Sequence, residues 1–339
     1  MSSLTDHTKR RWPFRRTRKI LGIVAATALG ITLASTGANA LLEQQERWST
    51  AQYGELVEVA GGSLNVVRAG TEGGQPLVLL SGLGTIAPAL DFAPLIRELV
   101  DYDVIVVERF GYGYSDMSAR DRTVENTSTE LHKALSSLDI GKPYVLAGHS
   151  IAGFYTLDYA NRYPGEVAAV IGIDPTVPTT ELEKPSAAGG INIAGILSAI
   201  GLVRTVVSIA PGSVDPTSDD FTKTELERMR QMTIWNFGNA AVADESARVA
   251  SNAAALRGMT YPQNIPVLHF LASDSVATIP DWLESHKNQL KGVNRHEIVE
   301  LQGLHNLQWT QSTAMAKKIT QFLQDSAPSQ TKPTPPQVQ

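Results

Sequence analysis

The chain has 339 residues, of which 42% are hydrophobic and 19% charged, a composition typical of one large globular domain. It contains no cysteine, which excludes disulfide bonds, thiolate catalysis and cysteine-ligated metal sites. Residues 1–19 hold seven of the 29 basic residues and one of the 34 acidic ones, so the remainder is acidic, which argues against nucleic-acid binding as the main function.

The N-terminal residues 1–42 read as a basic leader followed by an apolar segment. Residues 20–42 carry no charge, and arginines and lysines precede them. This segment fits a membrane anchor, because it is just long enough to cross the hydrocarbon core. It also fits a signal peptide cleaved near Ala40, after the small residues of Ala38-Asn39-Ala40. In both alternatives the basic residues stay on the cytoplasmic side of the membrane, and the chain after the apolar segment is predicted to be extracytoplasmic.

The chain then alternates between strand-like and helix-like runs. Two strands turned by Gly61-Gly62 predict an opening hairpin, and short apolar runs predict buried strands. The predicted strands are Glu55–Ala60, Ser63–Ala69, Leu77–Leu80, Val104–Val107, Tyr144–Ala147, Val167–Ile173, Pro266–Leu271 and His296–Leu301. The helical patterns between them are Pro88–Val100, Val124–Leu138, Ile151–Tyr163 and Ser312–Leu323.

This alternation predicts an α/β fold with a mostly parallel, doubly wound sheet. Residues 178–264 break it, since they contain helical stretches (Ile191–Ile209, Lys223–Asn236 and Ala240–Arg257) and no convincing strand. We therefore expect a core of residues 54–177 and 265–325 with a helical cap at 178–264. The apolar cap would shape an apolar pocket, although part of its apolar face could simply pack on the core. Residues 326–339 contain four prolines and predict a disordered tail.

Ser150 is the predicted nucleophile. It lies in Gly148-His149-Ser150-Ile151-Ala152-Gly153, between a predicted strand and a predicted helix. A serine between very small residues at such a junction is the signature of a nucleophile elbow. Ala152 stands where glycine is usual, and its methyl group is the smallest possible departure.

A serine nucleophile needs a histidine base and a carboxylate that holds the histidine in one tautomer. Of the seven histidines, only His305 falls in a loop just beyond a predicted strand end, before the last helix. We predict His305 as the base, because sites form at the carboxyl edge of an open α/β sheet.

Asp274 is the favoured acid, because it follows the penultimate predicted strand and lies between Ser150 and His305 in the chain. Asp174 is the rival, at the end of the strand after the elbow, where it could instead cap a turn. Asp281 is a weaker candidate, since a carboxylate at a helix start more often serves the helix terminus.

Two backbone amides should stabilise the oxyanion of the tetrahedral intermediate. The amide of Ile151 is one, because it follows the nucleophile at the start of a helix. The loop Ser81-Gly82-Leu83-Gly84 follows a predicted strand, and its glycines let the backbone turn inward. We assign the Leu83 amide as the second donor.

These residues resemble the α/β-hydrolase superfamily, over a match from about Gly54 to Leu323. The segment from Glu108 to Asp116 is similar to the family's Asp-Arg-x-Gly-x-Gly-x-Ser turn, with Glu108 in place of aspartate, and the leader resembles membrane-anchored or exported bacterial members. In this resemblance Arg109 and Asp116 are structural, and Gly111 and Gly113 supply the tight turn. Ser81 replaces a common histidine.

The resemblance implies an α/β-hydrolase fold with a Ser150–Asp274–His305 triad. It disfavours members with an aspartate nucleophile, such as dehalogenases and epoxide hydrolases, because Ser150 occupies that position. The predicted function is an esterase- or lipase-like serine hydrolase acting on carboxylic esters, with a small-molecule, apolar acyl substrate and no cofactor or metal. Peptidase, thioesterase and acyltransferase activities share this serine, and a non-catalytic binding protein on the same scaffold remains an alternative.

Overall fold

The computed structural model describes residues 14–183 and 192–326. Its centre is an eight-stranded sheet in the order β1-β2-β4-β3-β5-β6-β7-β8. The strands are β1 (Glu55–Val59), β2 (Gly62–Gly70), β3 (Gln75–Leu80), β4 (Tyr102–Glu108), β5 (Tyr144–His149), β6 (Val167–Ile173), β7 (Val267–Ala272) and β8 (His296–Leu301). Strands β1 and β2 form an antiparallel hairpin, β2 pairs antiparallel with β4, and the remaining neighbours are parallel. The predicted α/β fold with a mostly parallel sheet is confirmed.

The helices outside the cap region are α1 (Phe14–Ser49), α2 (Pro88–Asp91), α3 (Ala93–Glu98), α4 (Val124–Ser137), α5 (Ala152–Arg162), α11 (Ser273–Thr278), α12 (Trp282–Leu290), α13 (Leu307–Thr310) and α14 (Ser312–Ser326). The single helix expected over Pro88–Val100 is instead two short ones, which meet at Phe92. The predicted tail lies outside the described residues except for Ser326, which ends α14.

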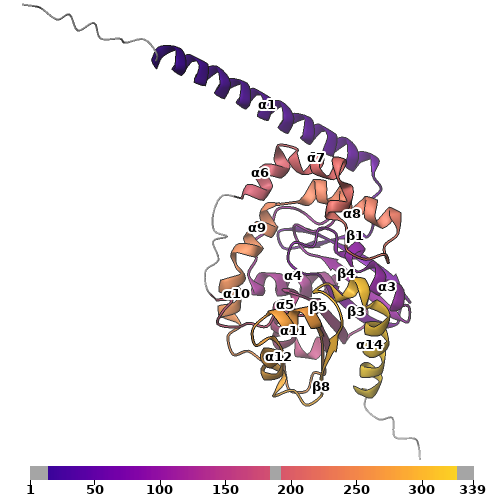
Figure 1. Cartoon of the computed structure of the whole chain (residues 1–339). Coiled ribbons are helices and arrows are strands. Elements are labelled where there is room, and N and C mark those ends of the chain that lie inside the picture. The colour runs from indigo at the N-terminus through magenta and orange to yellow at the C-terminus, as the bar shows by residue number, and fades with distance from the viewer. Residues whose placement is uncertain (1–13, 184–191, 327–339) are drawn as a thin grey trace, which may run out of the picture.

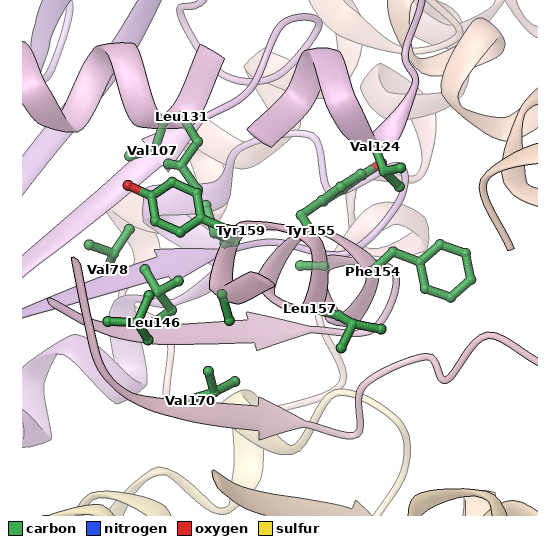
Figure 2. Packing of buried hydrophobic residues seen from close by; sticks show 14 of the residues in the cluster. Val78, Val107, Val124, Leu131, Leu146, Phe154, Tyr155, Leu157, Tyr159 and Val170 are labelled. Carbon is green, nitrogen blue, oxygen red and sulfur yellow. The ribbon is translucent and has the colours of Figure 1, made fainter. Parts of the chain in front are cut away.

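Helices cover both faces of the sheet, which explains why its central strands are continuous apolar runs. On one face, side chains of α4 and α5 pack against the strands; Figure 2 shows Leu131 and Tyr159 near Val107 and Val78. On the other face, Leu95 of α3 and Ile319 of α14 join a second cluster. The central strands are therefore enclosed on both faces, and the carboxyl edge of the sheet is left as the place for a site.

Among the described residues, five α-helices lie between β6 and β7 in the chain, in the region expected to form the cap. They are labelled α6 to α10 in Figure 1. They are α6 (Ile193–Ala199), α7 (Leu202–Ile209), α8 (Lys223–Asn236), α9 (Ala240–Ala247) and α10 (Val249–Ala255). The long helix expected over Ile191–Ile209 is broken at Gly201, whose φ of +78° is a left-handed conformation that favours glycine. Ile191 itself lies outside the described residues.

Helix α1 extends away from the body and joins it near its C-terminal end (Figure 1). Its residues Thr17–Ser49 are long and apolar enough to cross a membrane, and the most apolar window is not buried in the protein. Length and composition alone also fit a signal sequence, so this helix is weak evidence for a membrane span.

Candidate active site

Ser150 lies in the tight turn between β5 and α5. Its φ of +53° is a left-handed conformation, which is uncommon for a residue other than glycine and is often found at functional sites. A Cβ on Gly148 would lie 3.0 Å from the carbonyl oxygen of Ala152, so the elbow leaves no room for a larger residue there. The methyl group of Ala152 itself is fully buried and is accommodated.

His305 lies in the loop after β8, and its partner is Asp174. The Nδ1–H of His305 donates to Oδ2 of Asp174 at 2.6 Å. Asp174 follows β6 and is completely buried, whereas the His305 side chain is 42% exposed. A carboxylate at Nδ1 fixes the tautomer whose Nε2 is free to accept a proton.

Several further donors hold the Asp174 carboxylate in place. The Ala272 amide donates to Oδ1 at 3.1 Å, the Trp282 indole donates to the same oxygen at 2.9 Å, and the Ser275 hydroxyl donates to Oδ2. Burial alone would raise the pKa of Asp174, but the hydrogen bonds from His305, Ser275 and Trp282 outweigh it and lower the pKa. Asp174 therefore stays ionised opposite the imidazole.

The predicted pairing of His305 with Asp274 is wrong. Strand β7 ends at Ala272 and helix α11 begins directly at Ser273, so Asp274 falls in the first turn of a helix and is exposed. Its backbone amide bonds to Gly303, but its side chain does not reach His305. Asp281 also lies elsewhere, exposed at the start of α12 with a φ of +55°.

His149, next to the serine, is a residue of the candidate site that the sequence pattern of the elbow does not mark. It is buried, its Nε2–H donates to the His305 carbonyl at 3.3 Å, and the two rings lie 4.7 Å apart. Burial and the neighbouring His305 lower the pKa of His149 to about 3, so it is neutral near pH 7. His149 therefore supports the histidine loop without adding charge to the site.

The loop Ser81–Gly84 lies against the elbow. A Cβ built on Gly82 would come within 3.1 Å of the Ser150 Cβ, so the glycine allows this close approach. Among the described residues, neither the Leu83 amide nor the Ile151 amide donates to another protein group. The next amide, that of Gly84, donates to the Tyr112 hydroxyl at 3.1 Å.

A buried ion pair braces this loop from the cap. Arg109 donates to the Ser81 carbonyl at 2.8 Å and to Glu245 of α9 at 2.9 Å. Glu245 also accepts from the hydroxyls of Tyr112 and Tyr155, each at 2.6 Å. Arg109 therefore has a structural role, as expected: it links the loop to α9. The sequence around Glu245 gives no signal that Glu245 pairs with Arg109.

The turn after β4 is built around Glu108. This buried carboxylate accepts from Asn65 at 2.9 Å and from the Tyr114 amide at 2.9 Å. Gly113 has a φ of +55°, and a Cβ there would overlap the Glu108 carboxylate, so only glycine fits. Asp116 accepts from the Ser63 amide at 2.8 Å and ties the turn to the opening hairpin.

Among the described residues, no hydrogen bond joins the Ser150 side chain to His305, whose ring bonds to Asp174. Such contacts are often long in structures without substrate and tighten on binding. Within the same part of the chain, no cluster of histidine and acidic residues could hold a metal ion.

Comparison with known proteins identifies relatives of the fold. A family model described as the alpha/beta hydrolase fold matches residues 75–190. An uncharacterized protein of Bacillus subtilis, YbdG, is 28% identical over 80% of this chain and 85% of its own length. Lipase 1 of Psychrobacter immobilis is 26% identical over 45% of this chain and 48% of its own.

Solved structures show the same fold. Epoxide hydrolase A of Mycobacterium thermoresistibile superposes with a TM-score of 0.60 at 19% identity, over 81% of this chain and 98% of the other. The chain therefore has the α/β-hydrolase fold, as its sequence predicted, and residues 75–190 are similar to the alpha/beta hydrolase family model.

Proposed function

We propose that this chain is an extracytoplasmic serine hydrolase that cleaves carboxylic esters through an acyl-enzyme. The observation that carries the proposal is the 2.6 Å bond between His305 and the buried Asp174, beside a serine with a φ of +53°. A strained serine, a histidine and an ionised carboxylate in one place are the components of nucleophilic acyl transfer.

In the first half-reaction, Ser150 Oγ attacks the ester carbonyl carbon while His305 Nε2 accepts the hydroxyl proton. The resulting oxyanion accepts hydrogen bonds from the amides of Leu83 and Ile151, and the start of α5 adds a favourable dipole. The intermediate then collapses, the alcohol leaves with the proton from His305, and an ester of Ser150 remains.

In the second half-reaction, water attacks the acyl-enzyme. His305 accepts a proton from the water and returns it to Ser150 Oγ as the acyl–serine bond breaks, which releases the carboxylic acid. Asp174 remains ionised throughout and stabilises the imidazolium that forms in each half.

The substrate class follows from the nucleophile and from the relatives. Ser150 forms an acyl ester, whereas an epoxide hydrolase of this fold would use aspartate at that position, so the resemblance to that structure supports the fold alone. The sequence similarity to a lipase favours esters with an apolar acyl group. Helix α1 supports retention at a membrane, with the catalytic body on the extracytoplasmic side.

A panel of p-nitrophenyl esters and amino-acid amides, with a Ser150→Ala variant, tests the proposal. We expect hydrolysis of esters in preference to amides, and a loss of turnover of roughly four to six orders of magnitude in the variant. A fluorophosphonate probe should label the wild-type chain and not the variant. Ester hydrolysis that survives the substitution would refute the assignment of Ser150.

A further inference from the structure

An uncharged, exposed apolar face lies on the cap helices α6 and α7. Residues 192–210 carry one charge, that of Arg204. On α6 the exposed side chains Ile193 and Ile196 are three residues apart, and on α7 Leu202, Val206 and Ile209 are spaced by four and three. Such spacings place side chains on one face of a helix.

These five residues, the cap face, are unusually exposed. Ile209 is 79% exposed and Ile193 is 64% exposed. The one charge within residues 192–210 is held against α1, because the Arg204 guanidinium bonds to Asn39 at 2.8 Å and to Glu46. Exposed apolar side chains gathered on one face of a helix indicate an interaction surface.

Helix α1 fixes where this face lies relative to a bilayer. Ser35 of α1 donates to the Ile200 carbonyl at 2.6 Å, and Asn39 donates to the Ser198 carbonyl at 3.2 Å, so the turn between α6 and α7 sits on α1 (Figure 1). The hydrocarbon core is about 30 Å thick, which an α-helix crosses in about 20 residues. A span that starts at Ile20 therefore ends at about Asn39.

For such a span, Ser35 and Asn39, which bond to the turn between α6 and α7, lie at the edge of the bilayer nearest the body. The last part of α1 also contacts α8. Trp235 donates to Glu46 at 2.9 Å. Arg47 donates to Asn236 at 3.2 Å, and its guanidinium lies 4.6 Å from the centre of the Trp235 ring. The body is therefore held against the end of the apolar segment by both polar and charged groups.

We propose that the cap face lies in the surface of the bilayer that α1 crosses, with its five apolar side chains in the lipid leaflet nearest the body. This proposal rests on the membrane anchor of the proposed function and adds a second contact to it. Amphipathic helices at the membrane–water interface bury their apolar face in this way. The contacts of α6 and α7 with lipid would fix the orientation of the body on the membrane.

The absence of cysteine from the chain allows a direct test with single labels. Val206→Cys and Val100→Cys are matched, because both valines are about half exposed and Val100 lies at the opposite, amino edge of the sheet. Leu29→Cys reports on α1. Each full-length variant carries an environment-sensitive fluorophore and is reconstituted in phosphatidylcholine vesicles with or without nitroxide-labelled lipid.

We expect a blue-shifted emission and quenching by the nitroxide lipid at Leu29 and Val206, and water-like emission with little quenching at Val100. Quenching at Leu29 with an unquenched, water-like Val206 would overturn the cap-face proposal and leave the anchor intact. An unquenched Leu29 would refute the anchor and the cap-face proposal together. A blue-shifted Val206 that the lipid does not quench would show a protein occupant, such as a second copy of the chain, and would also overturn it.

Discussion

Asp174 is the residue on which the proposed chemistry most depends. It is fully buried, has a φ of +42°, and accepts hydrogen bonds from four donors, one of them His305. A non-glycine residue in the left-handed region persists only when its surroundings hold it there. Ser150 also has a positive φ, and its amide donates to the Ile173 carbonyl at 3.1 Å, so the strained residues that follow β5 and β6 are neighbours.

We expect Asp174→Asn to lower kcat for ester hydrolysis by roughly 10³–10⁴-fold, because the amide no longer holds His305 in the required tautomer. Asp274→Asn is the matched control, since Asp274 is exposed and does not contact His305. It should leave kcat nearly unchanged. A greater loss in Asp274→Asn than in Asp174→Asn, with both variants folded, would restore Asp274 as the acid.

His286 should make the stability of the protein depend on pH. Its Nδ1 lies 3.0 Å from that of His269, and burial lowers the pKa of His286 to about 4. An unfolded histidine has a pKa of about 6.5. Between these values the unfolded chain binds a proton that the folded chain does not, so the free energy of unfolding falls as the pH drops through this window and is unaffected above it.

The matched variant for this effect is His286→Asn, measured by urea unfolding in mild detergent at pH 7 and pH 5. The wild-type free energy of unfolding should fall by about 1–2 kcal/mol more than that of the variant over this interval, because one titrating group is removed. Equal falls in the two proteins would contradict the pKa assigned to His286.

At the scale of elements, the cap and the core are joined through Glu245. This side chain of α9 is buried with Arg109, which in turn holds the Ser81 carbonyl of the proposed oxyanion loop. Removing one partner of a buried ion pair costs about 3–5 kcal/mol, because the other charge is left uncompensated. The loop that presents the Leu83 amide would lose its brace at the same time.

Glu245→Gln should therefore lower both the free energy of unfolding and kcat. Glu130→Gln is the control, because Glu130 forms a second buried pair, with Arg122 at 2.8 Å, and has no hydrogen bond to the loop. It should destabilise the protein comparably and leave kcat within about twofold of the wild-type value. If both variants lost kcat equally, the effect would be one of stability and not of loop position.

The elements that the sequence predicted best are the ones with a simple physical signal. The central strands are buried on both faces and read as apolar runs, and the glycine turn marks the opening hairpin. Each of the eight strands lies within a few residues of its predicted range. The ends of helices are harder to predict than the strands. The break between α2 and α3 at Phe92 and the start of α11 directly after β7 have no strong local sequence signal. That second boundary is why Asp274 was favoured over Asp174.

The site shows the same division between local and tertiary information. The Ser150 elbow was recognisable because its geometry needs small residues close in sequence. The carboxylate partner of His305 could not be recognised from the sequence. It depends on whether the end of β6 or the end of β7 faces the loop after β8. His149 contacts His305, which lies 156 positions further along the chain, and Glu245 contacts Arg109, which lies 136 positions before it. No local sequence pattern indicates contacts over such separations.

At the scale of the molecule, α1 and the cap form one unit that joins the catalytic body to the N-terminal segment. Cleavage near Ala40, the signal-peptide alternative, would remove the contacts of Ser35 and Asn39 with the cap. It would leave Glu46 and Arg47, which bind α7 and α8. The cap face would remain exposed in either case.

A chain that lacks residues 1–40 therefore isolates the cap face. We expect it to hydrolyse a water-soluble ester like the full-length protein, because the described site begins at Ser81, and to bind phosphatidylcholine vesicles reversibly through α6 and α7. A Val206→Asp, Ile209→Asp double substitution should weaken this binding by at least about 100-fold, since burying each aliphatic side chain contributes about 1.5–3 kcal/mol. Vesicle flotation with soluble-ester turnover as the folding control measures both, and equal flotation of the two truncated proteins would show that the cap face does not enter the lipid.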